Sequence, residues 1–89
     1  MPAAFGLDQN YPNPFNPATE IRFRLADSGP VKLAVHDLLG RELAVLVDGV
    51  REAGSHNVSF DAVGLPSGVY VYRLTSGRRV EARRMLLLK

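Results

Sequence analysis

The sequence predicts an all-β fold, a sandwich of about seven antiparallel strands, and two patterns indicate it. In most segments apolar residues alternate with polar ones, as they do on a strand with one buried face and one wetter face. Clusters of glycine, proline, serine and aspartate interrupt these segments at intervals close to the roughly 8–12 residues typical of β-sandwiches. The length of 89 residues and the hydrophobic content of 46% fit one small globular domain.

Three segments show the alternation most clearly. Ile21, Phe23 and Leu25 are separated by charged residues, and the segments 31–36 and 70–75 repeat the pattern. The expected strands are about residues 5–9, 19–25, 31–37, 42–47, 55–60, 69–75 and 79–88. A helix competes for 41–47 and 79–88 because Arg, Glu, Leu and Ala favour helices, but neither segment is long enough or well enough capped.

The core is expected to consist of the inward-facing residues of these strands. They are Ile21, Phe23, Leu33, Val35, Val58, Phe60, Tyr70, Tyr72 and Leu74. Turns are expected between strands, among them Asp48-Gly49 and Pro66-Ser67-Gly68.

Residues 10–17 contain three prolines. They cannot form a central strand, because proline fixes φ and offers no backbone donor. We expect a rigid, extended loop in which Tyr11 and Phe15 cover the sandwich.

Charge is distributed unevenly along the chain. Residues 73–89 hold six basic residues and one acidic residue, a net +5, whereas residues 1–72 hold five basic and eight acidic residues, a net −3. A basic terminal segment can contact nucleic acid, a membrane surface or a protein. A solvated edge strand that its charges protect against aggregation explains the same pattern.

The residues from Met1 to Phe5 lack the basic start and the apolar run of a signal peptide. We expect residues 1–4 to be an artificial start or a linker remnant, and the natural protein to extend further toward its N-terminus. No apolar stretch approaches the roughly 18 residues that span a bilayer.

Residue types that carry catalysis are sparse. The chain has no cysteine, which excludes thiol chemistry and thiolate metal sites. His36 and His56 lie on separate expected strands without a partner in a known ligand spacing. Isolated aspartates at turns bond their own backbone, and a structural calcium ion stays an open alternative. We therefore expect no enzyme activity, no catalytic residue, no assigned metal site and no cofactor.

Three tyrosines offer an alternative binding chemistry. Tyr11, Tyr70 and Tyr72 would bind sugars if they formed an exposed aromatic platform. We favour the interpretation that Tyr70 and Tyr72 are core residues whose hydroxyl groups reach the edge of the core.

Several motifs occur in a linked order along the chain. They are Asn10-Tyr11-Pro12-Asn13-Pro14-Phe15-Asn16-Pro17-Ala18-Thr19-Glu20-Ile21-Arg22-Phe23, Val31-Lys32-Leu33-Ala34-Val35-His36-Asp37-Leu38-Leu39-Gly40-Arg41, Ala53-Gly54-Ser55-His56, Ser67-Gly68-Val69-Tyr70-Val71-Tyr72-Arg73-Leu74, and Arg84-Met85 ahead of Lys89. With these motifs the chain resembles, over nearly its whole length, the C-terminal sorting domain of the type IX secretion system and the related immunoglobulin-like domain of flagellar hook-capping proteins. Two positions depart from the family pattern: His36 stands where tyrosine is frequent, and Phe60-Asp61-Ala62 stands for tryptophan-aspartate-glycine, which predicts a different turn after Asp61.

The resemblance implies an immunoglobulin-like β-sandwich, one domain over residues 1–89, at the C-terminal end of a larger exported protein. Such a protein enters the periplasm through a separate N-terminal signal, and its sorting domain is then recognised at the outer membrane. A sortase-like protease often removes the domain, and the cargo becomes attached to the cell surface. We therefore expect partners in the type IX machinery and its protease, indirect contact with the outer-membrane surface, no nucleic-acid partner and a monomeric state. The expected location is the periplasm in transit, then the outer-membrane cell surface or the medium.

The expected recognition residues lie near the C-terminus. They are Gly68, Tyr70, Arg73, Arg83, Arg84, Met85 and Lys89. The resemblance assigns this role to Gly68, Tyr70, Arg73 and the end segment. An apolar anchor with a charged rim is the usual layout of a recognition patch, and Met85 and Leu87 beside the basic residues fit it. A last strand is also an edge that can pair with a partner's sheet.

Two other functions stay open at this point. A carbohydrate-binding or adhesive module of a secreted enzyme would require exposed aromatic residues in a groove. A structural assembly domain, as in flagellar hook caps, would require a place inside a longer chain.

Overall fold

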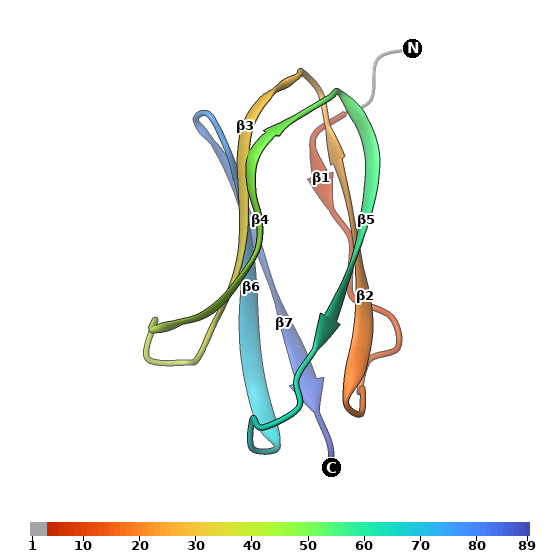
Figure 1. Ribbon diagram of the computed structural model, residues 1–89, viewed down its shortest axis with the longest axis vertical. Helices are drawn as coiled ribbons and strands as arrows, with labels where there is room; N and C mark the ends of the chain where they lie inside the picture. Colours follow the sequence, from red (N-terminus) through yellow and green to blue (C-terminus); the bar gives the residue numbers. More distant parts are fainter. Residues whose placement is uncertain (1–3) are drawn as a thin grey trace.

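The structure, a computed structural model, describes residues 4–89 and is a β-sandwich of two antiparallel sheets (Figure 1). The strands are β1 (Gly6–Leu7), β2 (Ala18–Leu25), β3 (Gly29–His36), β4 (Glu42–Arg51), β5 (Gly54–Asp61), β6 (Gly68–Ser76) and β7 (Arg79–Leu87). The predicted all-β sandwich of seven strands is confirmed, and the described residues contain no helix. The expectation for the chain start falls mostly on residues 1–3, which lie outside the described part.

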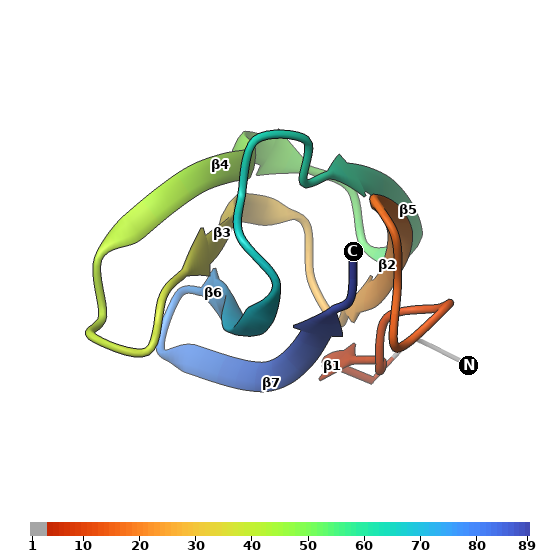
Figure 2. The same cartoon turned by 90° about the horizontal axis from the view of Figure 1, so that it is seen from below.

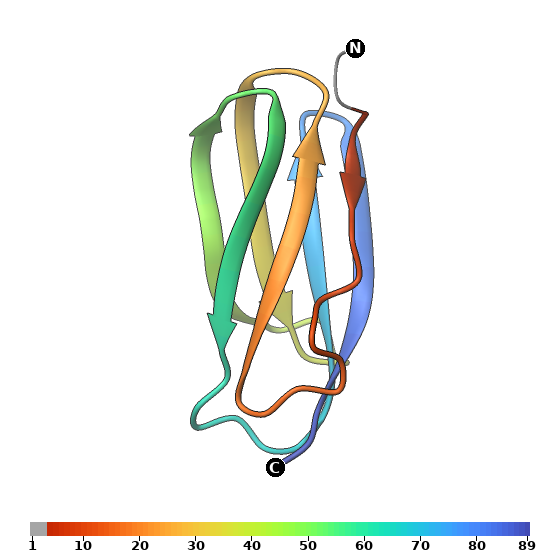
Figure 3. The same cartoon turned by 90° about the vertical axis from the view of Figure 1, so that its right-hand side faces the viewer.

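One sheet has the strand order β1-β2-β5 and the other β4-β3-β6-β7. The chain passes between the sheets from β2 to β3, from β4 to β5 and from β5 to β6, and the hairpins β3–β4 and β6–β7 each stay within one sheet (Figures 2 and 3). β1 and β7 are edge strands of different sheets, and they lie side by side (Figure 2). The first and last strands therefore meet across one side of the sandwich.

The core lies between the sheets and contains eight of the nine residues expected there, each at most 6% exposed. The ninth prediction is wrong in degree, because Val58 is only half-buried. Val58 pairs with Ile21 from β5, an edge strand, so it packs against the rim of the core. Leu7, Met85 and Leu87 complete the core from β1 and β7.

One predicted turn is wrong. Asp48-Gly49 lies inside β4, which continues to Arg51 because its pairing with β3 continues to Gly29. Gly49 accommodates the path with a φ of 149°, a value that side chains rarely allow. The turn after Asp61 needs no glycine at position 62, since the Asp61 carboxylate accepts the Val63 backbone N–H at 3.0 Å.

The prediction that Tyr11 and Phe15 of the proline-rich loop cover the sandwich is confirmed for Phe15 and wrong for Tyr11. Phe15 is buried and packs on Phe60, with the ring centroids 6.2 Å apart. Tyr11 does not cover the sandwich: its side chain is 80% exposed. Backbone bonds in both directions between Tyr11 and Glu20, each 2.9 Å, hold Tyr11 as a bridge partner on the outer side of β2.

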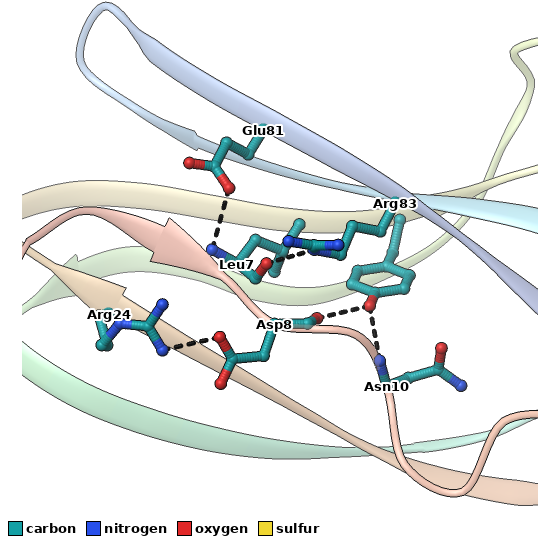
Figure 4. Close-up of polar contacts among 7 residues, drawn as sticks. Leu7, Asp8, Asn10, Arg24, Glu81 and Arg83 are labelled. Atoms are coloured by element: carbon teal, nitrogen blue, oxygen red, sulfur yellow. Dashed lines mark hydrogen bonds and ion pairs between the residues drawn. The ribbon is translucent and has the colours of Figure 1, made fainter.

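Tyr72, at the centre of β6, binds the N-terminal segment. Its hydroxyl group donates to the Asp8 carbonyl at 2.6 Å and accepts the Asn10 backbone N–H at 2.8 Å (Figure 4). The Asn10 side chain is also buried, and it donates to the Thr19 hydroxyl at 3.0 Å. Burial of Tyr72 raises the pKa of its hydroxyl to about 12, although the bond from Asn10 acts in the opposite direction.

Phe23→Ala tests the core. Phe23 is fully buried and stacks on His56 at 5.2 Å between ring centroids. The truncation should lower the unfolding free energy by about 3–5 kcal/mol, against a total of about 5 kcal/mol for a domain of this size. The variant should therefore be nearly unfolded, and a cooperative thermal melt close to that of the parent would contradict the core assignment.

Tyr72→Phe tests the binding of the N-terminal segment. The substitution leaves the Asp8 carbonyl and the Asn10 N–H without their partner, and it should cost about 1–3 kcal/mol at neutral pH. Because the folded-state pKa of Tyr72 lies near 12, above the ordinary value of 10.0, the parent should lose stability as the pH rises from about 10 to about 12. The Phe variant should lack this component, so denaturant unfolding at pH 7 and pH 11 should show a smaller difference between the two proteins at the higher pH.

Candidate functional site

The β6–β7 hairpin carries six of the seven expected recognition residues, and Lys89 follows it directly. The register pairs Tyr70 with Met85 and Tyr72 with Arg83. Because side chains alternate along a strand, these paired positions point into the sandwich. The positions between them point to the outer face of the sheet. The hairpin therefore divides the expected residues between two environments.

The expected apolar anchor is not on the surface. Met85 and Leu87 are buried in the core, at 1% and 0% exposure. Tyr70 is buried beside them, and its hydroxyl group donates to the Pro66 carbonyl at 2.5 Å. The prediction that Met85 and Leu87 form an exposed anchor is wrong, because β7 has an inner face that the small core needs.

Arg83 is exposed, but it lies on the side of β7 that meets β1 and has a partner within the domain. Its Nε donates to the Leu7 carbonyl oxygen, and the Glu81 carboxylate accepts the Leu7 N–H at 3.1 Å (Figure 4). Two charged side chains of β7 thus satisfy the backbone of β1 across the gap between the two sheets. The Arg83 side chain is still exposed, so its place at the rim of a recognition patch stays a prediction.

Arg73 and Arg84 face outward. Arg73 lies opposite Ala82 and Arg84 lies opposite Val71, so the two arginines stand on neighbouring strands in a diagonal arrangement. Both are exposed, and neither forms an ion pair with any residue between 4 and 89. The half-buried or exposed apolar side chains around them are Val69, Val71, Ala82 and Leu86. Together Arg73, Arg84 and these four residues form what we call the outer hairpin face.

The edge of β7 is covered along its C-terminal half. The Phe15 N–H donates to the Leu86 carbonyl and the Leu88 N–H donates to the Phe15 carbonyl, each at 3.0 Å. The Asn13 side chain accepts the Leu86 N–H at 3.0 Å, and the Gln9 side chain donates to the Arg84 carbonyl at 2.7 Å. The proline-rich loop therefore occupies the edge that was expected to pair with a partner's sheet. Because prolines have no backbone N–H to donate, the residues that stand between the prolines, Asn13 and Phe15, form the hydrogen bonds to this edge.

The two ends of the hairpin are also fixed. Gly68 has a φ of 154°, a value that residues with a side chain rarely adopt. The Lys89 backbone N–H donates to the Ser67 hydroxyl at 2.9 Å. The Lys89 side chain is exposed, close to where β6 begins.

The alternative chemistries find little support in the geometry. Tyr70 and Tyr72 are buried, so they cannot form a sugar-binding platform with Tyr11. His56 stacks on Phe23, and its Nε2 lies 2.7 Å from the Glu52 carbonyl. In the part of the chain that the structure describes, no three His, Asp or Glu residues are grouped so that they could hold a metal ion. None of its segments is a helix long and apolar enough to cross a membrane.

Comparison with known proteins gives one family. The family model described as "Secretion system C-terminal sorting domain" matches residues 9–88. No curated protein sequence matches the chain. Among solved structures, PorZ, described as an essential bacterial surface component of the type IX secretion system of Porphyromonas gingivalis, has a similar fold, with a TM-score of 0.63 and 20% sequence identity. The match covers 96% of this chain but only 11% of PorZ. Because the family model covers almost every residue that folds into the sandwich, the chain belongs to the secretion system C-terminal sorting domains, the non-catalytic signal domains of type IX secretion.

Proposed function

We propose that the outer hairpin face, together with the Lys89 side chain, is the surface through which the type IX machinery recognises this domain. The observation that carries the proposal is the pair Arg73 and Arg84. Both are exposed, lack an internal carboxylate partner and stand among apolar side chains. Arg24, Lys32 and Arg41 each have an acidic partner within the domain. Among the described residues Arg22, Arg51 and Arg78 are also exposed without such a partner, and Arg73 and Arg84 differ from them in standing together among apolar side chains.

The chemistry of this face fits protein recognition. Arginine is enriched at protein interfaces, where a planar guanidinium can bind a carboxylate through two parallel hydrogen bonds. Valine and leucine side chains beside it exclude water and strengthen such bonds. Gly68 and Tyr70 contribute indirectly in this proposal, because Gly68 sets the start of β6 and Tyr70 fixes that end through its bond to Pro66.

We infer a route and a fate for the protein that carries the domain. It crosses the periplasm, and the folded monomeric domain is recognised at the outer membrane. A sortase-like protease of the machinery then removes the domain while the cargo is attached to the cell surface or released. In this proposal the domain has no enzymatic activity of its own and no nucleic-acid partner, and residues 1–89 act as one unit.

Export of a fusion protein tests the proposal. Residues 1–89 placed at the C-terminus of a periplasmic reporter should carry the reporter to the cell surface or the medium of a type IX-competent host. The fraction outside the cell is measured by fractionation and reporter activity. A parent fusion that stays in the periplasm would refute the sorting function for this chain.

A charge variant tests the recognition surface. Arg73→Gln, Arg84→Gln and Lys89→Gln together should reduce export of the fusion at least about tenfold, because truncating a hot-spot residue costs about 2 kcal/mol or more and about 1.4 kcal/mol is a tenfold change. The matched control removes three exposed charges elsewhere, with Arg22→Gln, Arg51→Gln and Arg78→Gln. Export of the first variant at the level of the control would exclude the outer hairpin face as the signal.

Arg83 is left out of that variant because it stabilises the fold. Arg83→Gln removes a charge-assisted bond to the Leu7 carbonyl and should lower the unfolding free energy by about 1–2 kcal/mol. Arg84→Gln, one residue away on the outer face, should change it by less than about 0.5 kcal/mol. Urea unfolding of the two single variants makes the comparison, and equal stabilities would show that the Arg83 contact contributes nothing.

A further inference from the structure

The connection between β3 and β4, residues 37–41, exposes apolar side chains that neither the core nor the outer hairpin face accounts for. We call it the hairpin tip. Figure 1 shows this connection projecting sideways from the sandwich, toward the end where the C-terminus lies. Leu38 and Leu39 at its apex are 65% and 80% exposed.

The backbone of the hairpin tip is held by a dense set of bonds to Asp37. The Asp37 carboxylate accepts the backbone N–H groups of Leu39 and Arg41, each at 2.9 Å, and the Arg41 Nε at 2.7 Å. The Asp37 backbone also donates to the Arg41 carbonyl and accepts the Gly40 N–H, each at 3.0 Å. The Arg41 backbone N–H is the main group that holds the pKa of the Asp37 carboxyl below its ordinary value. Gly40 completes the turn with a φ of 86°.

These hydrogen bonds order the loop, and the ordered loop holds the two leucine side chains exposed to water. Four bonds fix the backbone and a fifth joins the Asp37 and Arg41 side chains, so the apolar side chains project from a preorganised support. Burial of an apolar side chain is favourable, yet nothing in the described part of the domain covers these two. A rigid support also lowers the entropy that a partner must remove on binding. An apolar pair on a preorganised support is therefore suited to fill a pocket of a partner.

The hairpin tip is continuous with the outer hairpin face. His36, the last residue before the tip, lies opposite Val71 in β6, and Val71 lies opposite Arg84 in β7. Arg84 therefore stands two strands away from His36 on the same face of the sheet, and a partner that extends from the tip across β6 meets its unpaired guanidinium. Charge complementarity then requires acidic groups next to its apolar pocket.

A lipid surface or a second copy of the chain fits these features less well. Asp37 and Arg41 pair with each other, so the tip itself adds no free positive charge to that of the outer hairpin face. Two leucines are also a small apolar anchor for a bilayer. A second copy would have to supply an apolar socket. One hollow on the described surface has apolar side chains, Phe5, Ala26 and Pro30, but Asp27 is its one acidic residue and Arg78 and Arg79 flank it. Another has the acidic residues Asp8 and Glu20, but Tyr11 is its one apolar side chain.

We propose that the hairpin tip inserts Leu38 and Leu39 into an apolar, acid-rimmed pocket of a folded protein of the export machinery. This inference rests on the proposed function and adds a second, apolar contact to the basic one. The tip and the outer hairpin face then form one continuous recognition surface, and the apolar anchor lies in the β3–β4 connection rather than in β7.

Export of the reporter fusion tests the inference. Leu38→Ser with Leu39→Ser should reduce the exported fraction at least about tenfold. Val50→Ser with Val63→Ser is the matched control, since both valines are at least 70% exposed at other places on the domain. The control should export as the parent does, and the melting temperatures of both variants should match that of the parent. Export of the leucine variant at the control level would overturn the inference, whereas failure of the parent fusion would instead overturn the proposed function.

Three further measurements identify the partner class. A photo-crosslinking residue at position 39 of the fusion should give a protein adduct in exporting cells, and the same residue at position 63 should give none. The purified domain should not sediment with vesicles of phosphatidylethanolamine and phosphatidylglycerol, and it should be monomeric by analytical ultracentrifugation. Vesicle binding or dimerisation that the leucine substitutions abolish would overturn the assignment to a protein pocket, as would the absence of an adduct at position 39.

Discussion

The two hydrogen bonds of the Tyr72 hydroxyl group determine how the ends of this chain come together. One reaches the Asp8 carbonyl and the other comes from the Asn10 N–H, so a residue at the centre of the C-terminal hairpin holds the segment that follows β1. β1 belongs to the opposite sheet. The bonds therefore cross the sandwich at its edge, in a buried place where a lost partner would leave a polar group without water.

The position of the proline-rich loop follows from this constraint. Once Asn10 is fixed, the loop runs along β7, where Asn13 and Phe15 bond the backbone around Leu86. The side chains of Glu81 and Arg83 satisfy Leu7 further along the same strand. β7 is thus an edge strand in topology but is partly covered in fact, and an open edge invites unwanted pairing with other chains. Any signal on the folded hairpin has to be read from its outer face.

The sequence predicted the strands well because period-two alternation reports which face of a strand is buried. It located five of the six expected turns between or next to strands, and it failed at Asp48-Gly49, where pairing with β3 overrides a local turn signal. The prediction for Tyr11 failed because the sequence of a loop does not show whether an aromatic side chain points toward the core or toward solvent. Val58 was predicted to be a core residue because alternation does not show that β5 is an edge strand, where side chains are less completely buried.

The candidate site was predicted as a stretch of sequence rather than as a surface, and the register explains the difference. A run such as Arg83-Arg84-Met85 reads as one basic and apolar cluster, but neighbouring residues of a strand point to opposite faces. Arg84 faces water, whereas Met85 is in the core and Arg83 bonds β1. Which parity faces inward depends on contacts with Leu7 and Tyr72, residues that are far away in the sequence.

In β7 some side chains hold the fold together while others are exposed on the outer face, and this limits what can be learned by shortening the chain. Removing the last residues would take Leu87 out of the core and the partner of Phe15 away from the proline-rich loop. The loop is bound in turn to Tyr72 through Asn10, so the loss would spread to the contact between the sheets. For a domain of this size, whose stability is a small difference between large terms, a truncated end and an unfolded domain give the same result. Recognition and folding can be separated only by changing outward-facing side chains such as Arg84 and Leu39 while the inward-facing ones are kept.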